Sequence, residues 1–310
     1  MTDAVQLPPG VTVLERGWLS ANNIVFEGAQ GTALVDSGYG THAAQTVALV
    51  TQVLRGRALD LLINTHLHSD HCGGNAALQA AFPAMATHVP PGQAEAVRRW
   101  DEDVLSYRPT GQWCPAFKFD GLVHPGDELV LADQPWQVHA APGHDPHSII
   151  LFEPSSRTLL SADALWQDGF GVVFPELEGE SAFDEVARVL DLIEALEPTV
   201  VVPGHGAVFA GAGAIAAALA RARGRLSSFV ADPARHAGHA VKVLIKFKLL
   251  EWQRIPLQQL STWAAATSYL PCVAERYFAG VPFDAWLSGL VDQLIRSGVL
   301  ARDGDAIVNI

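Results

Sequence analysis

Cysteine is scarce in this chain, with three residues among 310. Cys72, Cys114 and Cys272 form no CxxC pair, and their odd number argues against a disulfide framework. Free thiols persist in a reducing compartment, so we expect a cytoplasmic protein.

Membrane-targeting segments are also lacking. The first ten residues, MTDAVQLPPG, have neither the basic start nor the apolar stretch of a signal peptide. No apolar run approaches the roughly 18 residues needed to span a bilayer. We therefore expect no membrane association.

Basic residues are in deficit, with 20 Lys and Arg against 33 Asp and Glu and a net charge of −13. Such a surface repels polyanions and anionic membranes, which argues against a nucleic-acid partner and favours a small-molecule substrate. Apolar residues, at 49%, are plentiful enough for a large buried core. Over the first two thirds of the chain, short β-rich segments alternate with helical ones, the pattern of a layered α/β domain.

Metal-binding residue types are concentrated in residues 65–71 (THLHSDH), directly after the apolar strand predicted at 61–63. Three histidines and one aspartate lie within six residues. Imidazole and carboxylate together form the ligand set that suits zinc, iron and manganese. This spacing predicts a metal site.

Three later predicted strands also end at such residues. The strand over 136–140 leads to His144, that over 158–161 leads to Asp163, and that over 199–202 leads to His205. Glycine and proline stand beside these residues, as expected where the backbone must turn sharply to aim a side chain at a cation.

In this order (HxHxDH, GH, D, GH) the residues resemble the ligand signature of the metallo-β-lactamase superfamily, over about residues 8–224. The resemblance implies a four-layer αβ/βα sandwich holding two divalent metal ions, for which we expect Zn²⁺, with Fe or Mn as alternatives. It assigns one set of ligands to each metal and a bridging carboxylate to both. The implied ligands are His66, His68 and His144 for the first metal, Asp70, His71 and His205 for the second, and Asp163 as the bridge.

The resemblance implies a hydrolase in which a hydroxide shared by two metals attacks a small ester, thioester or lactone. Asp70 and Asp163 are the expected catalytic carboxylates, and Asp70 is also placed to accept a proton. An aspartate at 163 argues against an antibiotic-hydrolysing enzyme, and a histidine at 68 argues against a flavodiiron role. A single-strand endoribonuclease, a mononuclear-iron persulfide dioxygenase and a non-catalytic metal-binding scaffold remain as alternatives.

Several residues near the motifs have two interpretations each. Asp36 either supports the ligands or simply forms a turn, and His147 either orients a ligand, touches substrate or hydrogen-bonds within its loop. Trp166 and Phe170 either form a substrate wall or pack their own loop. We expect Cys72 to be a packing residue and not a ligand.

Beyond residue 224 the sequence becomes helical in period and ends in two short predicted strands, which divides the chain into domains 1–224 and 225–310. The tail resembles a winged-helix unit with Asp303-Gly304 as its hairpin turn. It carries nine basic and seven acidic residues, a net +2, and is therefore poorly suited to bind a polyanion. We expect it to cover one side of the pocket or to mediate self-association.

Overall fold

The computed structural model describes residues 5–310, and the first four residues of the predicted domain 1–224 lie outside the described residues. The chain forms two compact units: residues up to Asp101 with Cys114–Leu226, and Glu102–Trp113 with Ser227–Ile310. The second unit therefore also contains residues 102–113, which the predicted boundary at residue 224 assigned to the first domain.

The first sheet of the first unit has the order β1-β2-β3-β4-β5-β6. β1 to β3 pair in antiparallel fashion, and β3 to β6 continue in parallel. Its strands are β1 (Val11–Leu14), β2 (Asn23–Glu27), β3 (Thr32–Val35), β4 (Leu61–Ile63), β5 (Ala86–Val89) and β6 (Gly121–Leu122).

The second sheet has the order β12-β11-β10-β9-β8-β7. β8 and β10 both pair antiparallel with β9, while β11 runs parallel to β10. The carboxyl ends of β8, β10 and β11 therefore share one edge of this sheet. Its strands are β7 (Glu128–Leu131), β8 (Gln134–Ala140), β9 (Ile149–Glu153), β10 (Thr158–Ala162), β11 (Val200–Pro203) and β12 (Phe209–Ala210).

The core lies between the two sheets and follows the two-residue period of the strands. In β2, Ile24 and Phe26 join the cluster that also holds Trp136 of β8 and Leu160 of β10. Val25 faces the other way and packs with residues of helices α1 and α3. Both faces of the first sheet are buried, which explains its nearly continuous apolar strands.

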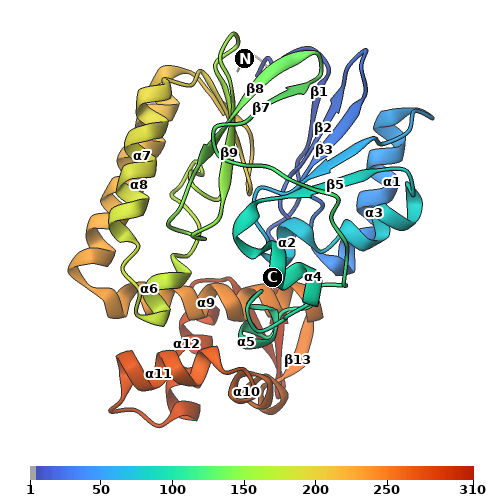
Figure 1. Cartoon of the computed structure of the whole chain (residues 1–310). Coiled ribbons are helices and arrows are strands. Elements are labelled where there is room, and N and C mark those ends of the chain that lie inside the picture. The colour runs from blue at the N-terminus through green and yellow to red at the C-terminus, as the bar shows by residue number, and fades with distance from the viewer. Residues whose placement is uncertain (1–4) are drawn as a thin grey trace. The chain divides into compact units, whose positions relative to one another are not determined.

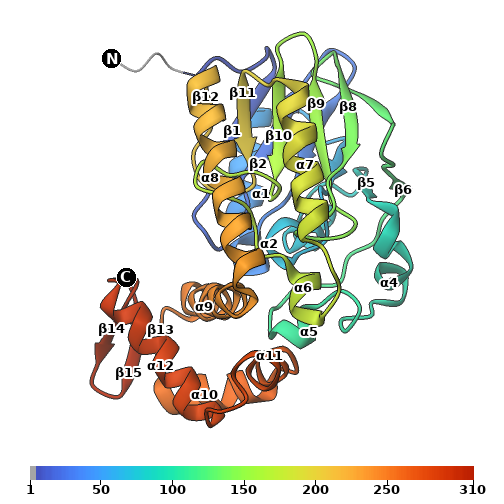
Figure 2. The same cartoon turned by 90° about the vertical axis from the view of Figure 1, so that its left-hand side faces the viewer.

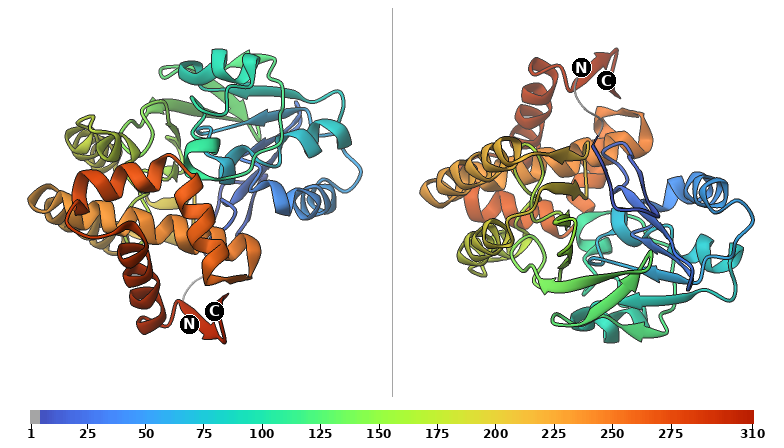
Figure 3. Two further views of the ribbon diagram at one scale, coloured as in Figure 1. Left: turned by 90° about the horizontal axis from the view of Figure 1, so that it is seen from below. Right: turned by 90° about the horizontal axis from the view of Figure 1, so that it is seen from above.

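Helices cover the outer faces of both sheets. α1 (Ala43–Leu54) and α3 (Asn75–Ala81) lie on the first sheet, and α7 (Phe183–Leu196) and α8 (Ala212–Ala231) lie on the second (Figures 1 and 2). The views along the strands show the layers of the first unit in the order helix, sheet, sheet, helix (Figure 3). The predicted αβ/βα sandwich is confirmed.

The helix that follows β5 is short, at six residues. After the short turn η2 (Pro91–Gln93), α4 (Ala94–Arg99) ends because Trp100 adopts a left-handed backbone conformation with φ of 50°. A helix cannot continue through that conformation. The remaining short helices of this unit are η1 (Gly40–His42), α2 (Ser69–Cys72) and α6 (Phe174–Glu178).

The second unit combines helices with a small sheet of order β13-β15-β14. Within it, the Trp263 indole donates to the carbonyl of Gly111, which anchors the internal segment. Its elements are α5 (Tyr107–Thr110), α9 (Pro233–Trp252), β13 (Arg254–Pro256), α10 (Leu257–Ala266), α11 (Tyr269–Phe278), α12 (Phe283–Arg296), β14 (Leu300–Asp303) and β15 (Ala306–Asn309). A winged-helix assignment for α10 to β15 stays a prediction. Over residues 5–310, none of the helices has the length and apolar content to cross a bilayer.

Candidate metal centre

The seven predicted ligands come together in the first unit as two groups. They stand after β4, β8, β10 and β11, where the backbone leaves the sheets. Within each group, one nitrogen or oxygen atom per side chain lies within 4.8 Å of the others. The first group is His66, His68 and His144, and the second is Asp70, His71, Asp163 and His205.

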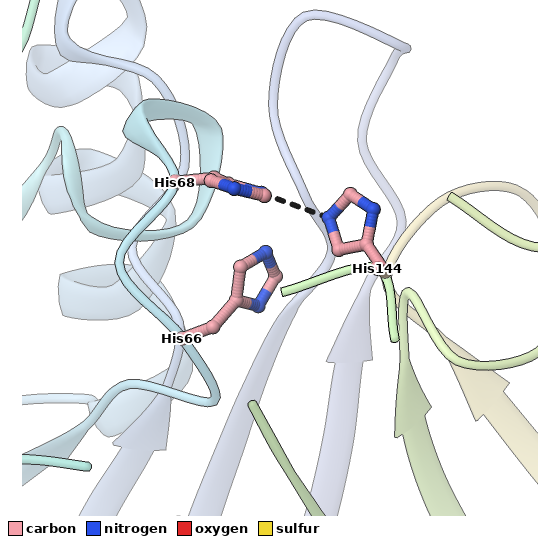
Figure 4. A group of neighbouring side chains, drawn as sticks. All are labelled: His66, His68 and His144. Atoms are coloured by element: carbon pink, nitrogen blue, oxygen red, sulfur yellow. Dashed lines mark hydrogen bonds between the residues drawn. The ribbon is translucent and has the colours of Figure 1, made fainter. Parts of the chain in front are cut away.

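The first group consists of three imidazoles that face one another. His66 and His68 come from one loop and His144 from the facing one (Figure 4). The Nδ1 of His68 lies 2.8 Å from the Nε2 of His144. Among residues 5–310, the buried Nε2 of His66 has no hydrogen-bond partner. Three inward-facing nitrogens are thus available to one cation.

The second group combines two imidazoles with two carboxylates. His205 Nε2 lies 3.0 Å from Asp70 Oδ2, and His71 Nε2 lies 3.9 Å from the same oxygen. The buried His71 Nε2 also makes no hydrogen bond of good geometry within the described chain.

Asp163 lies between the two groups with one carboxylate oxygen toward each. Its Oδ2 is 3.3 Å from His144 Nε2, and its Oδ1 is 3.4 Å from His71 Nε2 and 3.8 Å from His205 Nε2. Gly204 makes this position accessible, because a β-carbon there would overlap Asp163 Oδ1. The glycine before His205 is therefore a steric requirement of the centre.

Asp36 contacts the candidate ligands from behind. Its Oδ2 lies 2.7 Å from His71 Nδ1, and its two oxygens accept hydrogen bonds from the backbone and hydroxyl of Thr65. The Thr65 hydroxyl in turn lies 3.1 Å from His66 Nδ1. These contacts fix the outer nitrogens of His66 and His71 and direct the other ring nitrogen inward.

Two supporting groups were missed by the sequence analysis. The carbonyl of Val172 lies 2.5 Å from His144 Nδ1, and the buried Asp145 has its Oδ2 3.7 Å from His68 Nε2. A main-chain carbonyl leaves no trace in the sequence, whereas Asp145 directly follows His144 and was readable there. His147 has an exposed ring beside Gly92, and its backbone N–H donates to Asp145 Oδ1.

Burial and neighbouring charges shift the pKa values of these histidines in different directions. Burial holds the pKa of His66 well below its ordinary value and lowers the pKa of His144 to about 4. Burial also opposes charging of His71, but the carboxylates of Asp163, Asp36 and Asp70 outweigh it and raise the pKa of His71 well above normal. Against burial, the neighbouring His71 and His205 lower the pKa of Asp163.

This donor set fits divalent cations. Two buried carboxylates and several imidazole nitrogens point at common centres, and two of those nitrogens, His66 Nε2 and His71 Nε2, lack hydrogen bonds. Buried polar atoms without partners are costly unless a ligand satisfies them. Imidazole and carboxylate are ligands of zinc, iron and manganese.

Aromatic rings flank both groups. The centroid of the Trp166 ring lies 5.4 Å from the ring centroid of His205 and 5.4 Å from that of Trp18. The ring of Trp18 in turn stacks on that of His205, with 6° between the two planes. Phe174 contacts His68 and His144 on the other side. Phe170 is 3% exposed and packs in the interior, whereas Trp18 is 56% exposed.

Cys72 is buried beside the ligand loop. Its sulfur lies 3.3 Å from the carbonyl of His68 and 3.8 Å from the sulfur of Cys114. It belongs to neither group of candidate ligands.

Comparison with known proteins places the chain among relatives that share this architecture. It is 24% identical to bovine acyl-coenzyme A thioesterase MBLAC2 over 208 residues, covering 60% of this chain and 72% of the relative. It is 27% identical to hydroxyacylglutathione hydrolase of Brucella anthropi over 157 residues, covering 51% of this chain and 48% of that enzyme. The chain thus spans only about half the length of the second relative.

Solved structures share the fold. The metallo-beta-lactamase family protein TTHA1429 from Thermus thermophilus matches with a TM-score of 0.55 and 20% identity, over 98% of this chain and all of that one. TTHA1623, solved in a di-iron-bound form, matches with a TM-score of 0.51 and 24% identity, over 67% of this chain and 98% of its own. The family model of the metallo-beta-lactamase superfamily matches residues 16–205, which include all seven candidate ligands. The chain therefore belongs to the metallo-beta-lactamase superfamily.

Proposed function

We propose that the protein is a binuclear metal-dependent hydrolase of small thioesters, with esters and lactones as related substrates. The observation that carries the proposal is the position of Asp163, which presents one oxygen to each of two groups of metal-binding side chains. A single-metal site would use only one of these two oxygens.

The three imidazoles of the first group would hold one cation, and Asp70, His71 and His205 would hold the other, with Asp163 shared. We expect Zn²⁺, with iron or manganese as alternatives. When bound, such a pair would supply an activated water and would polarise the carbonyl of the substrate. No nucleophilic side chain is then required.

The carboxylate of Asp70 is available for proton transfer. Burial opposes its ionisation, but the adjacent His71 and His205 prevail and lower its pKa. Asp70 is therefore ionised at neutral pH, and its Oδ2 faces the centre of the second group. We propose that Asp70 accepts the proton released during hydrolysis.

The surroundings favour an apolar acyl group. Trp18, Trp166 and Phe174 line the two sides of the centre with aromatic surface. Pockets for small molecules commonly combine such surface with few polar groups. Relatives named as an acyl-coenzyme A thioesterase and a hydroxyacylglutathione hydrolase favour thioesters within the ester-like substrates.

The Asp163→Ala variant tests this proposal. We expect it to lose at least one bound metal and about a thousandfold in thioester turnover, because the carboxylate shared by both cations is gone. Asp184→Ala is a matched control, since this aspartate is exposed on α7 of the same unit. Metal content measured by elemental analysis and hydrolysis followed by thiol release provide the two readouts.

The outcome of the assay also separates the alternatives. Unchanged metal content and turnover in Asp163→Ala would reject the binuclear hydrolase. Salt-sensitive cleavage of single-stranded RNA without thioester hydrolysis would favour the nuclease, and oxygen consumption with a persulfide would favour the dioxygenase. Bound metal with no turnover on any of these substrates would leave a scaffold.

A further inference from the structure

Trp166 donates a hydrogen bond to the carboxylate that separates the two groups. Its indole Nε1 lies 3.2 Å from Asp163 Oδ1. We propose that Trp166 is a positioning residue that orients this carboxylate and thereby sets the affinity of the second group for its cation. This inference rests on the metal centre of the proposed function.

The two oxygens of Asp163 are not equivalent. Oδ2 faces His144 of the first group, while Oδ1 faces His71 and His205 of the second. Rotation of the carboxylate about its Cβ–Cγ bond would turn Oδ1 away from His71 and His205. The hydrogen bond from Trp166 to Oδ1 opposes that rotation.

The chemistry of the donor makes this contact persistent. The other polar neighbours of Asp163 are imidazoles that we propose as ligands, and a nitrogen that binds a cation no longer carries a proton there. The indole N–H is a donor only and cannot bind a cation. It therefore remains available to Asp163 when metal is bound.

Trp166 is itself held in place. Its backbone forms a bridge with Gly169, with a distance of 2.6 Å from the Trp166 nitrogen to the Gly169 oxygen. The loop is fixed to α8 by Arg221, whose Nε donates to the carbonyl of Gln167, and by Arg225, which packs directly on Gly169. The indole ring also packs edge-on against Trp18 and His205. A donor fixed in this way orients its acceptor without needing to be ordered at each binding event.

The expected consequence is specific to one metal. Loss of a hydrogen bond to a ligating side chain typically costs about 10–100-fold in metal affinity. Because Trp166 contacts the oxygen that faces the second group, the loss should affect the second cation. The first cation keeps its three imidazoles.

The Trp166→Phe variant removes the N–H and keeps an aromatic ring. Metal-free protein is titrated with Zn²⁺ in competition with a chromophoric chelator. We expect two binding steps in the wild type, and in the variant a second step weakened by about tenfold with the first within twofold. Trp113→Phe, the same substitution at a half-exposed tryptophan of the second unit, should keep both steps.

A spectroscopic measurement reports on the hydrogen bond itself. In a ¹H–¹⁵N spectrum, the indole signal of Trp166 is identified by its absence from the Trp166→Phe variant. We expect this signal to shift at the second equivalent of Zn²⁺. Two unchanged steps in Trp166→Phe, or equal weakening of both, would overturn the inference while leaving the metal centre intact. A wild type that binds fewer than two cations would instead reject the proposed function, and this inference with it.

Discussion

Asp36 Oδ2 lies 2.7 Å from the Nδ1 of His71, and both side chains are buried. The carboxylate accepts a hydrogen bond from Nδ1–H, so the Nε2 of His71 is directed at Asp163 and Asp70. Asp36 can hold this position because its backbone adopts the left-handed conformation, with φ of 57°. A turn at the end of β3 thus determines which nitrogen faces the metal centre.

Replacement of Asp36 by Asn should weaken metal binding by about 10–100-fold. Asparagine tolerates the left-handed backbone, so the variant removes the negative charge with little effect on the turn. Chelator competition measures the affinity, and circular dichroism checks the fold. Asp127→Asn changes a carboxylate whose side chain is 43% exposed and should bind metal like the wild type. Equal affinities in both variants would show that Asp36 does not act through His71.

The sequence was sufficient to predict the sandwich and the loops whose candidate ligands the structure brings together, because these signals are local. Each candidate ligand follows an apolar strand, and the parallel direction of β8, β10 and β11 brings His144, Asp163 and His205 to one edge. The support from the Val172 carbonyl was not predictable, because it depends on how two loops meet. The assignment of 102–113 to the second unit was not predictable for the same reason, since it depends on tertiary contacts such as Trp263 with Gly111.

Metal binding should release a proton from His71 at neutral pH. The three neighbouring carboxylates raise the pKa of His71 well above its ordinary value, so the metal-free side chain is protonated. A cation must displace that proton, and affinity should therefore increase with pH, by up to about tenfold per unit while His71 remains protonated. His66 and His144, with lowered pKa values, are already neutral and should contribute no proton.

Calorimetric titration with Zn²⁺ in two buffers of different ionisation enthalpy measures this proton release. The wild type should release more protons than Asp36→Asn, in which one of the three carboxylates that raise the pKa of His71 is missing. A binding enthalpy that does not depend on the buffer would contradict the predicted protonation of His71.

Truncation of Trp18 should reduce selectivity for bulky acyl groups. Trp18 is 56% exposed, and its ring lies parallel to that of His205. An apolar group attached to the reacting carbonyl would therefore cover the ring of Trp18. For Trp18→Ala we expect the ratio of kcat/KM for phenylacetyl over acetyl thioesters to fall about tenfold, the equivalent of one lost aromatic contact. Val130→Ala, at an equally exposed apolar residue of β7, should leave the ratio unchanged. A parallel loss on both thioesters would show that Trp18 supports the loop and does not contact the acyl group.

The second unit should lose stability on acidification because of His236. This side chain is 1% exposed in α9 and packs against the ring of Phe229. Burial, with a further contribution from His239, lowers the pKa of His236 from 6.5 to about 4. Between these values the unfolded chain binds a proton that the folded unit excludes, so stability is full above pH 6.5 and declines toward pH 4. The expected loss is about 2 kcal/mol at pH 5.

Denaturant unfolding at pH 7.5 and pH 5 measures this dependence, and a variant at His236 separates its contribution from that of the other histidines. His236→Leu should show a smaller difference between the two pH values, because no group on that side chain is left to protonate. His124→Leu, at a side chain that is 55% exposed, should keep the full wild-type difference. If His236→Leu is as acid-sensitive as the wild type, then the proton that destabilises the unit binds at another residue.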